Sequence, residues 1–418
     1  MNFSNGDWWS RQPEIVKSAA GATVALVALS GIHTQIRHKL VLRRLHTGWC
    51  PSHCFTAAMQ DSLRKKPTAY IDRPEEAAKL KLLLESPACG FFYFCTGPPG
   101  GGKTTLIQRV CHEVGEGIIY VAAGSSPGHF GTQLANALQV LEQLPNPLML
   151  IYDYVLQFGG VEEQEKTTKL GSTLSALQAA ASDFKRYKKR PAALIIDNAD
   201  QLSRSEDILR HILFTAQQCA DRGLLKFVFV SSDDAFIAHM LGQSRCSKAA
   251  SLEILDLSEG EALELLCRRN IPSKAAVEVV NVTGGRLLQL LAAAEVLQHG
   301  GSSQDVRRIA LSGAETEFQK TGLLDETPQR SAGLRAVHAL LHRSHCKGGI
   351  DMETWNELVP NPQDKQLLLR DNVFAVTHEA GGGARVVFEN RPVEVYAAER
   401  LSEVVCKASQ EEKKMLKT

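Results

Sequence analysis

The octapeptide at residues 97–104 constrains this chain more than any other stretch of its sequence. It reads GPPGGGKT and matches the pattern G-x-x-x-x-G-K-[ST]. Glycines let a backbone fold into a nest of N–H groups that converge on a phosphate, because no Cβ blocks the approach. A helix that begins directly after the loop adds the positive end of its dipole. The pattern therefore predicts a site for nucleotide phosphates between a strand and a helix.

Two side chains at the end of this loop carry the expected chemistry. Lys103 offers a flexible positive charge to the outer phosphates, and Thr104 offers a hydroxyl to Mg²⁺, a hard cation that prefers oxygen. The candidate cofactor-binding residues of the loop are Gly97, Pro98, Pro99, Gly100, Gly101, Gly102, Lys103, Thr104 and Thr105. No N/T-K-x-D segment of the kind that reads guanine stands out in the chain.

The second half of such a site is an apolar strand that ends in an acidic residue. Leu194 to Ile196 form an apolar run, and Asp197 ends it. A carboxylate at this position holds Mg²⁺ directly or through water. We therefore predict Thr104 and Asp197 as the protein's metal ligands.

Short apolar runs alternate with longer segments of helical spacing between residues 90 and 230. Strands are predicted at 91–95, 118–122, 192–196 and 226–230, with helices between them. Such alternation is typical of the α/β class, in which helices cover both faces of a parallel sheet. The fold class that we predict is a P-loop NTPase parallel sheet, then a helical lid, then a small winged-helix-like α+β domain.

The later part of the chain changes character. Ser258 and Glu261 form a capping box that opens a helical unit. Farther on, helices precede two short strands, 373–377 and 385–388, which predict a hairpin. The predicted division is a leader at 1–65, an ATPase core at 66–256, a helical lid at 257–300, a linker at 301–331, a winged-helix-like domain at 332–404 and a charged tail at 405–418.

The segment 18–36 leaves three alternatives open. It contains no Lys, Arg, Asp or Glu, and its length is close to the roughly 20 residues that span a bilayer. Basic residues follow from Arg37 to Arg44, although alanine and glycine outnumber leucine within the segment. The segment is a membrane anchor, an organelle-targeting sequence or an ordinary amphipathic helix.

Composition narrows the partners and the compartment. The formal net charge is +1, so no global field attracts nucleic acid. The ten cysteines are scattered in a way that does not resemble a disulfide framework, which indicates a reducing, intracellular compartment. His46, Cys50, His53 and Cys54 do not follow a standard zinc spacing.

The order of these parts resembles the AAA+ ATPases, in particular the origin-recognition-like and archaeal-type members, and the related STAND signalling ATPases. The resemblance covers about residues 68–300, with a similar winged-helix domain to about 402. Four segments carry it besides the phosphate loop and Asp197, namely 71–76 before the first strand, 226–232 at the sensor strand, 257–259 at the start of the lid and 283–286 at a lid turn.

The resemblance implies roles for further residues and favours ATP over GTP. Ser231, at the end of the sensor strand, would sense the γ-phosphate, and Arg286, in the lid turn, would reach back to the nucleotide. Arg245 is the candidate arginine finger that completes a neighbouring subunit's site. The predicted cofactors are ATP and Mg²⁺.

One position departs from the family pattern. Many AAA+ proteins place a glutamate directly after the strand acid to orient the attacking water, and this chain has Asn198 there. Asn198 can hydrogen-bond a water but cannot take its proton, and Asp200 is the nearest acid. Hydrolysis is therefore slow, or relies on Asp200, or is absent.

Four functions compete at this level. The first is a nucleotide-dependent switch or remodelling factor that contacts a protein partner or its own copies. The second is an origin-recognition-like module that binds DNA through the C-terminal domain, whose basic residues are spread among acids rather than gathered in a stripe. The third is a non-hydrolysing scaffold tethered to a membrane through 18–36, and the fourth is a small-molecule kinase.

Overall fold

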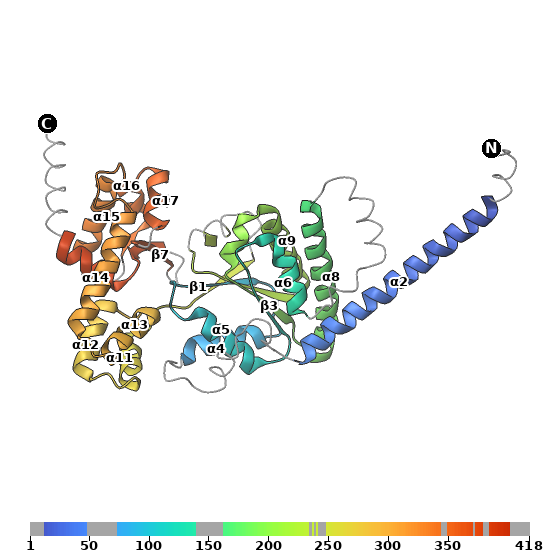
Figure 1. Ribbon diagram of the computed structural model, residues 1–418, viewed down its shortest axis with the longest axis horizontal. Helices are drawn as coiled ribbons and strands as arrows, with labels where there is room; N and C mark the ends of the chain where they lie inside the picture. The colour runs from blue at the N-terminus through green and yellow to red at the C-terminus, as the bar shows by residue number, and fades with distance from the viewer. Residues whose placement is uncertain are drawn as a thin grey trace, which may run out of the picture.

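A parallel sheet lies at the centre of the protein (Figure 1). It has five strands in the order β2-β3-β4-β1-β5. The computed structural model describes residues 12–47, 73–138, 162–233, 236–237, 240, 248–343, 349–370, 373–378 and 384–401. The strands of this sheet are β1 (Phe92–Thr96), β2 (Ile118–Ala122), β3 (Ala192–Asp197), β4 (Leu225–Val230) and β5 (Ala249–Glu253). The predicted class, a parallel sheet with helices on both faces, is confirmed.

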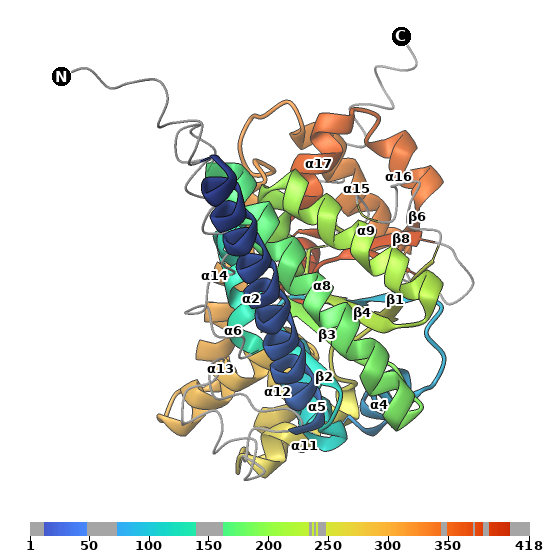
Figure 2. The ribbon, with the colours of Figure 1, turned by 90° about the vertical axis from the view of Figure 1, so that its right-hand side faces the viewer.

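Helices cover the two faces of this sheet. On one face lie α4 (Pro74–Glu85) and α5 (Lys103–Val114). On the other lie α2 (Gln12–Thr47), α6 (Phe130–Ala137), α8 (Glu162–Lys188) and α9 (Glu206–Arg222), of which α2, α8 and α9 run in front of the sheet in Figure 2. Alternate strand residues point to opposite faces, so Phe227 and Phe229 pack toward α9 while Val228 and Val230 pack toward α5.

The fifth strand was not predicted from the sequence. β5 pairs in parallel with β1, and Thr96 lies opposite Glu253. Its residues AASLE are only partly buried or exposed, so they lack the continuous apolar run that marks the other strands. This edge strand joins the sheet to the lid, because Leu257 and the lid helices follow directly.

Three helices form the predicted lid, α11 (Glu259–Arg268), α12 (Ser273–Thr283) and α13 (Leu287–Gln298). The predicted capping box is confirmed, since the Ser258 side chain accepts from the Glu261 N–H and the Glu261 side chain accepts from the Ser258 N–H. The segment 301–331, for which we predicted a linker, instead contains the helix α14 (Ser303–Lys320). A second capping box, formed by Ser302 and Asp305, begins α14. Phe318, near the C-terminal end of this helix, is buried in the hydrophobic core of the C-terminal part.

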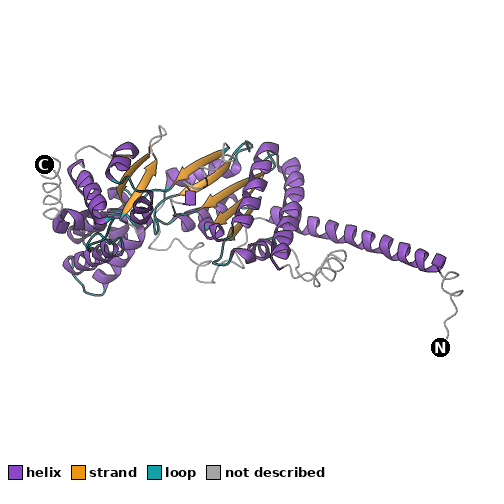
Figure 3. Cartoon of the chain, turned by 90° about the horizontal axis from the view of Figure 1, so that it is seen from above, coloured by secondary structure: helices purple, strands orange, loops and turns teal. Residues whose placement is uncertain are grey.

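The C-terminal part combines helices with a small antiparallel sheet of order β6-β8-β7. Its elements are α15 (Arg330–Arg343), β6 (Ile350–Asp351), α16 (Met352–Leu358), α17 (Pro362–Arg370), β7 (Phe374–His378), β8 (Ala384–Phe388), α18 (Arg391–Tyr396) and a π-helical turn (Ala397–Leu401). Trp355 and Phe374 lie in its core, which also includes Phe318 of α14. Figure 3 shows the strands in two groups, one in each sheet. The predicted hairpin and winged-helix-like fold are confirmed.

The N-terminal helix α2 extends away from the rest of the molecule (Figure 1). Its C-terminal half packs along α8, where Val41 and Leu45 join the core and His38 Nε2 lies 2.9 Å from Asp183 Oδ2. The segment 18–36, with its three open alternatives, lies within α2. Of the helices that the structure describes, none combines the length and the apolar character that crossing a membrane requires.

Candidate phosphate and metal site

The phosphate loop joins β1 to α5 and depends on its glycines. Gly97, Gly100 and Gly102 have φ values of +146°, +75° and +88°, in the region that side chains other than glycine rarely adopt. A Cβ on Gly97 would lie 2.0 Å from the carbonyl oxygen of Ile254. The loop therefore needs glycine here for both its turn and its close approach to the end of β5.

The side chain of Lys103 folds back into this loop. Its Nζ donates to the carbonyl oxygens of Gly97, at 2.7 Å, and Pro98, at 2.8 Å, and the residue is buried. These acceptors are neutral, so a phosphate oxygen can replace them as the stronger, charge-assisted partner. The predicted cation of the site therefore lies inside the loop.

Thr104 and Asp197 meet at the carboxyl edge of the sheet. Thr104 Oγ1 donates to Asp197 Oδ2 at 2.9 Å, and Asp197 is buried at the end of β3. Within the described residues, no group of three or more His, Cys, Asp or Glu side chains could hold a metal ion. Two oxygen ligands suit Mg²⁺, which fills its other positions with water and phosphate oxygens. The pair fits the metal site that the sequence predicted.

A buried tyrosine adds a third group that the sequence analysis missed. The Tyr120 hydroxyl, from β2, donates to Asp197 Oδ2 at 2.5 Å and accepts from Gln108 Nε2 at 3.0 Å. Burial, and then the Asp197 charge, raise the pKa of Tyr120, so the phenol stays protonated and remains a donor. A tyrosine inside an otherwise apolar strand needs a partner for its hydroxyl, and this was the available signal.

The predicted catalytic residues near Asp197 are placed differently from one another. Asn198 is exposed, has φ +53°, and donates its backbone N–H to Asp197 Oδ1 at 2.9 Å. Ser231 is buried at the end of β4, and its Oγ donates to Asp200 Oδ1 at 3.1 Å. Gln201 Nε2 donates to the other Asp200 oxygen at 2.6 Å. The structure thus brings Ser231 and Asp200 together beside Thr104 and Asp197, the predicted metal ligands.

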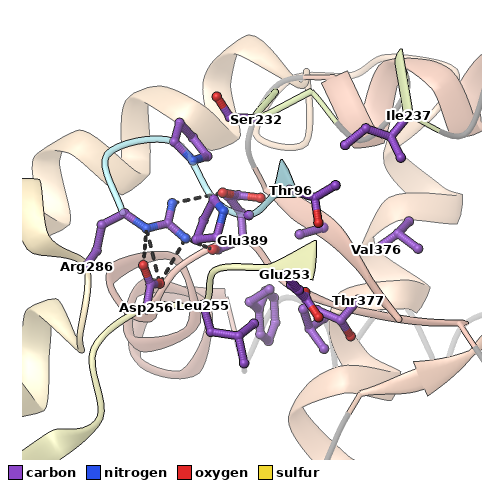
Figure 4. A pocket seen from close by; sticks show the side chains of 16 residues that line it. Thr96, Ser232, Ile237, Glu253, Leu255, Asp256, Arg286, Val376, Thr377 and Glu389 are labelled. Carbon is purple, nitrogen blue, oxygen red and sulfur yellow. Dashed lines mark hydrogen bonds and ion pairs between the residues drawn. The ribbon is translucent and has the colours of Figure 1, made fainter. Parts of the chain in front are cut away.

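Arg286 lies at the start of α13, and its side chain contacts two carboxylates (Figure 4). Its Nε and Nη2 donate to Asp256, at distances between 3.1 and 3.3 Å. Nη1 donates to Glu389 Oε1 at 2.8 Å, and Nη2 also donates to the Glu389 carbonyl oxygen at 2.7 Å. Asp256 follows β5 and Glu389 follows β8, and neither was predicted as a site residue.

A cavity of about 310 Å³ connects this arginine to the phosphate loop. Residues 96–99 line one side, Arg286 and Asp256 line its edge, and residues of the β7–β8 hairpin line the other side (Figure 4). The start of the phosphate loop, the lid and the C-terminal part therefore meet around one cavity. Arg245, the candidate arginine finger, lies outside the described residues.

The strand order, the glycine-rich loop and the Thr104–Asp197 pair together define a P-loop ATPase fold. Residues 90–236 match the family described as an AAA domain. This range includes the phosphate loop and β4. The chain therefore contains an AAA domain of the P-loop ATPase type.

Individual relatives are distant. Spastin from Ixodes scapularis is 21% identical over 210 residues, which cover 44% of this chain and 32% of spastin, so the chain spans about a third of that relative's length. A Walker-type ATPase of Pyrococcus abyssi is 14% identical with a TM-score of 0.50, over 79% of this chain and 96% of that one. The Aeropyrum pernix ORC2 protein in its ADP form is 14% identical with a TM-score of 0.43, over 84% and 98%. At 14% identity the likeness to the Pyrococcus abyssi ATPase concerns the fold alone.

Proposed function

We propose that this protein binds Mg²⁺–ATP at the phosphate loop, hydrolyses it slowly and acts as a nucleotide-dependent switch. The observation that carries the proposal is the hydrogen bond of 2.9 Å between Thr104 Oγ1 and Asp197 Oδ2. It supports the proposal, because a hydroxyl from α5 and a carboxylate from β3 that lie this close can share one small hard cation. Both groups lie beside the N-terminus of α5, which favours the negative charge of phosphates.

Each residue of the site has a distinct task in this proposal. Lys103 moves from the carbonyls of its own loop to the outer phosphates and neutralises their charge. Thr104 and Asp197 hold Mg²⁺, which, when bound, offsets charge on the phosphate oxygens. Ser231, fixed by Asp200, is the polar group beside the terminal phosphate.

The rate of hydrolysis is limited by the residues available to activate water. Asn198 carries no carboxylate, and its amide cannot take a proton. Asp200 has a carboxylate, but the hydrogen bonds that Ser231 and Gln201 donate to its two oxygens hold it in place. A general base must reach the proton of the nucleophile, so with Asn198 in place of a carboxylate and Asp200 held by two donors we expect slow turnover.

The lid contacts the same loop, which supports the switch. The Leu288 N–H, in the first turn of α13, donates to the Gly100 carbonyl oxygen at 3.1 Å. A Cβ on Gly100 would lie 2.9 Å from Leu288 Cβ. Nucleotide that reshapes the loop must therefore also act on α13, and closure of a lid over bound ligand is a common way to change protein state.

The test measures binding and turnover of ATP side by side for the wild type, Lys103→Ala, Asp197→Ala and Asn198→Glu. We expect the wild type to bind and to release phosphate slowly, Asn198→Glu to turn over faster, and the other two variants to lose Mg²⁺-dependent binding. Binding without any turnover in the wild type would leave a scaffold instead of an ATPase switch. Absence of nucleotide binding would refute the proposal.

Two finer parts of the proposal have their own tests. If a neighbouring copy supplies Arg245, phosphate release rises more steeply than linearly with protein concentration, and Arg245→Ala abolishes that rise. DNA binding through the winged-helix-like part remains the alternative function, because that fold serves both DNA and protein contacts. Binding to duplex DNA that weakens steeply with salt would favour it.

A further inference from the structure

We infer that Glu389 competes with a nucleotide phosphate for Arg286, so that ATP binding releases the C-terminal hairpin from the lid. This inference rests on the proposed function, because it describes how the same site is regulated. Arg286 joins the lid turn both to Asp256, which follows β5, and to Glu389, which follows β8 (Figure 4).

The first step is that two carboxylates already occupy the guanidinium group. Nε and Nη2 donate to Asp256, and Nη1 and Nη2 donate to Glu389. A guanidinium group offers five N–H donors in a planar fork, which suits a carboxylate or a phosphate equally well. The contacts with Asp256 and Glu389 engage four of these five N–H groups, so a phosphate can take a bidentate position on Arg286 only if a carboxylate gives way.

The second step concerns which carboxylate leaves. Asp256 follows the core strand β5 and is 31% exposed, and it contacts Arg286 from the same part of the chain as the phosphate loop. Glu389 follows β8 in the C-terminal part and is 9% exposed, against 7% for Arg286. A buried ion pair is costly to break unless a new partner replaces the lost one. A phosphate supplies that partner to Arg286, and water supplies it to Glu389 once the hairpin moves away. Asp256 cannot move away in the same manner, because the N–H of the next residue, Leu257, donates to the carbonyl oxygen of Gly285 beside the arginine.

The third step is that the lid turn itself is fixed. The Leu257 N–H donates to the Gly285 carbonyl oxygen at 2.9 Å. A Cβ on Gly285 would lie 1.8 Å from the carbonyl oxygen of Leu257, so the two segments touch through their backbones. Arg286 thus stays beside the phosphate-loop cavity, and the exchange of partners moves the hairpin and not the lid turn.

The geometry also limits how far the release extends. Gly284, two residues before Arg286, approaches Arg391 of α18, and Arg391 Nε donates to the Asn281 carbonyl oxygen at 3.3 Å. Phe318 of α14 continues to pack in the C-terminal core. Neither Arg391 nor Phe318 lines the cavity, so we expect the hairpin to loosen while the rest of the C-terminal part stays attached.

The experiment is amide hydrogen exchange on the full chain, with and without Mg²⁺ and a non-hydrolysable ATP analogue, followed in peptides that cover 373–390. We expect nucleotide to increase exchange there. Glu389→Gln should raise that exchange without nucleotide and tighten analogue binding about fivefold or more. The matched control is Glu399→Gln, which breaks an exposed ion pair with Arg307 away from the cavity and should change neither quantity.

The outcomes separate the inference from the function on which it rests. If the wild type binds the analogue and exchange in 373–390 does not change, or if Glu389→Gln binds it no more tightly than the wild type, the inference is wrong and the proposed function stands. If the wild type binds no nucleotide, the proposed function fails with it. Increased exchange in 373–390 of the wild type when the analogue binds, together with tighter binding of the analogue by Glu389→Gln, supports the competition.

Discussion

The two cations of this site, Lys103 and Arg286, lie in opposite situations. Lys103 contacts two neutral carbonyl oxygens of its own loop, both within six residues of it in sequence. Arg286 contacts two carboxylates, from Asp256 and from Glu389, which lie 30 and 103 residues away. Lys103 therefore contacts only a local turn in these hydrogen bonds, whereas Arg286 joins separate parts of the chain.

This difference assigns the two halves of the site different work. Neutral acceptors are exchanged for a phosphate with little opposition, so the Lys103 half is suited to binding. Carboxylates in a buried pair resist exchange, so the Arg286 half is suited to linking nucleotide to the position of the C-terminal part. The following predictions compare the halves, from the largest expected effect to the smallest.

Arg286→Ala should destabilise the protein far more than Lys103→Ala. Removal of the guanidinium breaks the ion pair of the largely buried Glu389 carboxylate, at a cost of about 3–5 kcal/mol in the free energy of unfolding. Removal of the Lys103 ammonium leaves neutral carbonyls and should cost about 1 kcal/mol. Denaturant unfolding of both variants without nucleotide measures this. Adding Glu389→Gln and Asp256→Asn to Arg286→Ala should recover part of the loss, and equal effects of the two single variants would contradict the comparison.

Nucleotide affinity should show the reverse order. Lys103→Ala loses hydrogen bonds from a charged donor to phosphate, which corresponds to about a 10- to 100-fold weaker affinity. Arg286→Ala should weaken affinity less, because its contact with phosphate replaces existing contacts with carboxylates. Calorimetric titration with a non-hydrolysable ATP analogue gives both values. A larger loss for Arg286→Ala would show that the arginine is not held back by its carboxylates.

Tyr120→Phe should weaken Mg²⁺ binding without removing nucleotide binding. Its hydroxyl donates to the same Asp197 oxygen as Thr104 does, so it fixes the orientation of that carboxylate. Groups that orient a metal ligand typically contribute about 10-fold or more to metal affinity. The measurement is the Mg²⁺ concentration that half-saturates nucleotide binding. Tyr93→Phe, on strand β1 of the same sheet, is the control, and a shift of similar size in it would point to general loosening of the core.

Glu317→Gln should change the pH dependence of stability. Burial raises the pKa of Glu317 to about 7 from its ordinary 4.5, and nearby Glu389 adds to this. Between these values the folded state binds more protons than the unfolded state, so stability present below pH 4.5 is lost as pH rises through 7. The variant should flatten this part of the profile in thermal unfolding between pH 4.5 and 7.5. Glu315→Gln, at an exposed position of the same helix, should leave it unchanged.

Much of the core could be predicted from local sequence. The phosphate loop, four of the five strands of the parallel sheet and the Ser258–Glu261 capping box each rest on residues within a short window. The metal pair followed from two such windows, since parallel strands bring their carboxyl ends to one edge of a sheet. β5 escaped because its residues are half-buried and include alanine and serine.

The contacts around Arg286 could not be predicted in the same way. Glu389 and Asp256 are single acids whose partner depends on tertiary packing, and no local pattern marks them. α14 was read as a linker because Gly300 to Ser303 look like a break, although Ser302 and Asp305 form its cap. Tyr120 looked like one more core residue of a buried strand, and only the structure shows what its hydroxyl reaches.

Thr96 pairs with Glu253 at the ends of β1 and β5, so the phosphate loop and the segment that leads to Asp256 leave the sheet at the same point. The Ile254 N–H donates to the Thr96 carbonyl oxygen at 2.8 Å, so these two segments are rigidly joined where they leave the sheet. One segment runs directly into the phosphate loop, and the other reaches Asp256 three residues beyond Glu253. A displacement of the phosphate loop is therefore transmitted through a few peptide bonds to Asp256, which contacts Arg286. This short connection tolerates no change in length. We expect one residue inserted after Ile254 to uncouple movement of the phosphate loop from movement of the hairpin, while the binding groups of each stay intact.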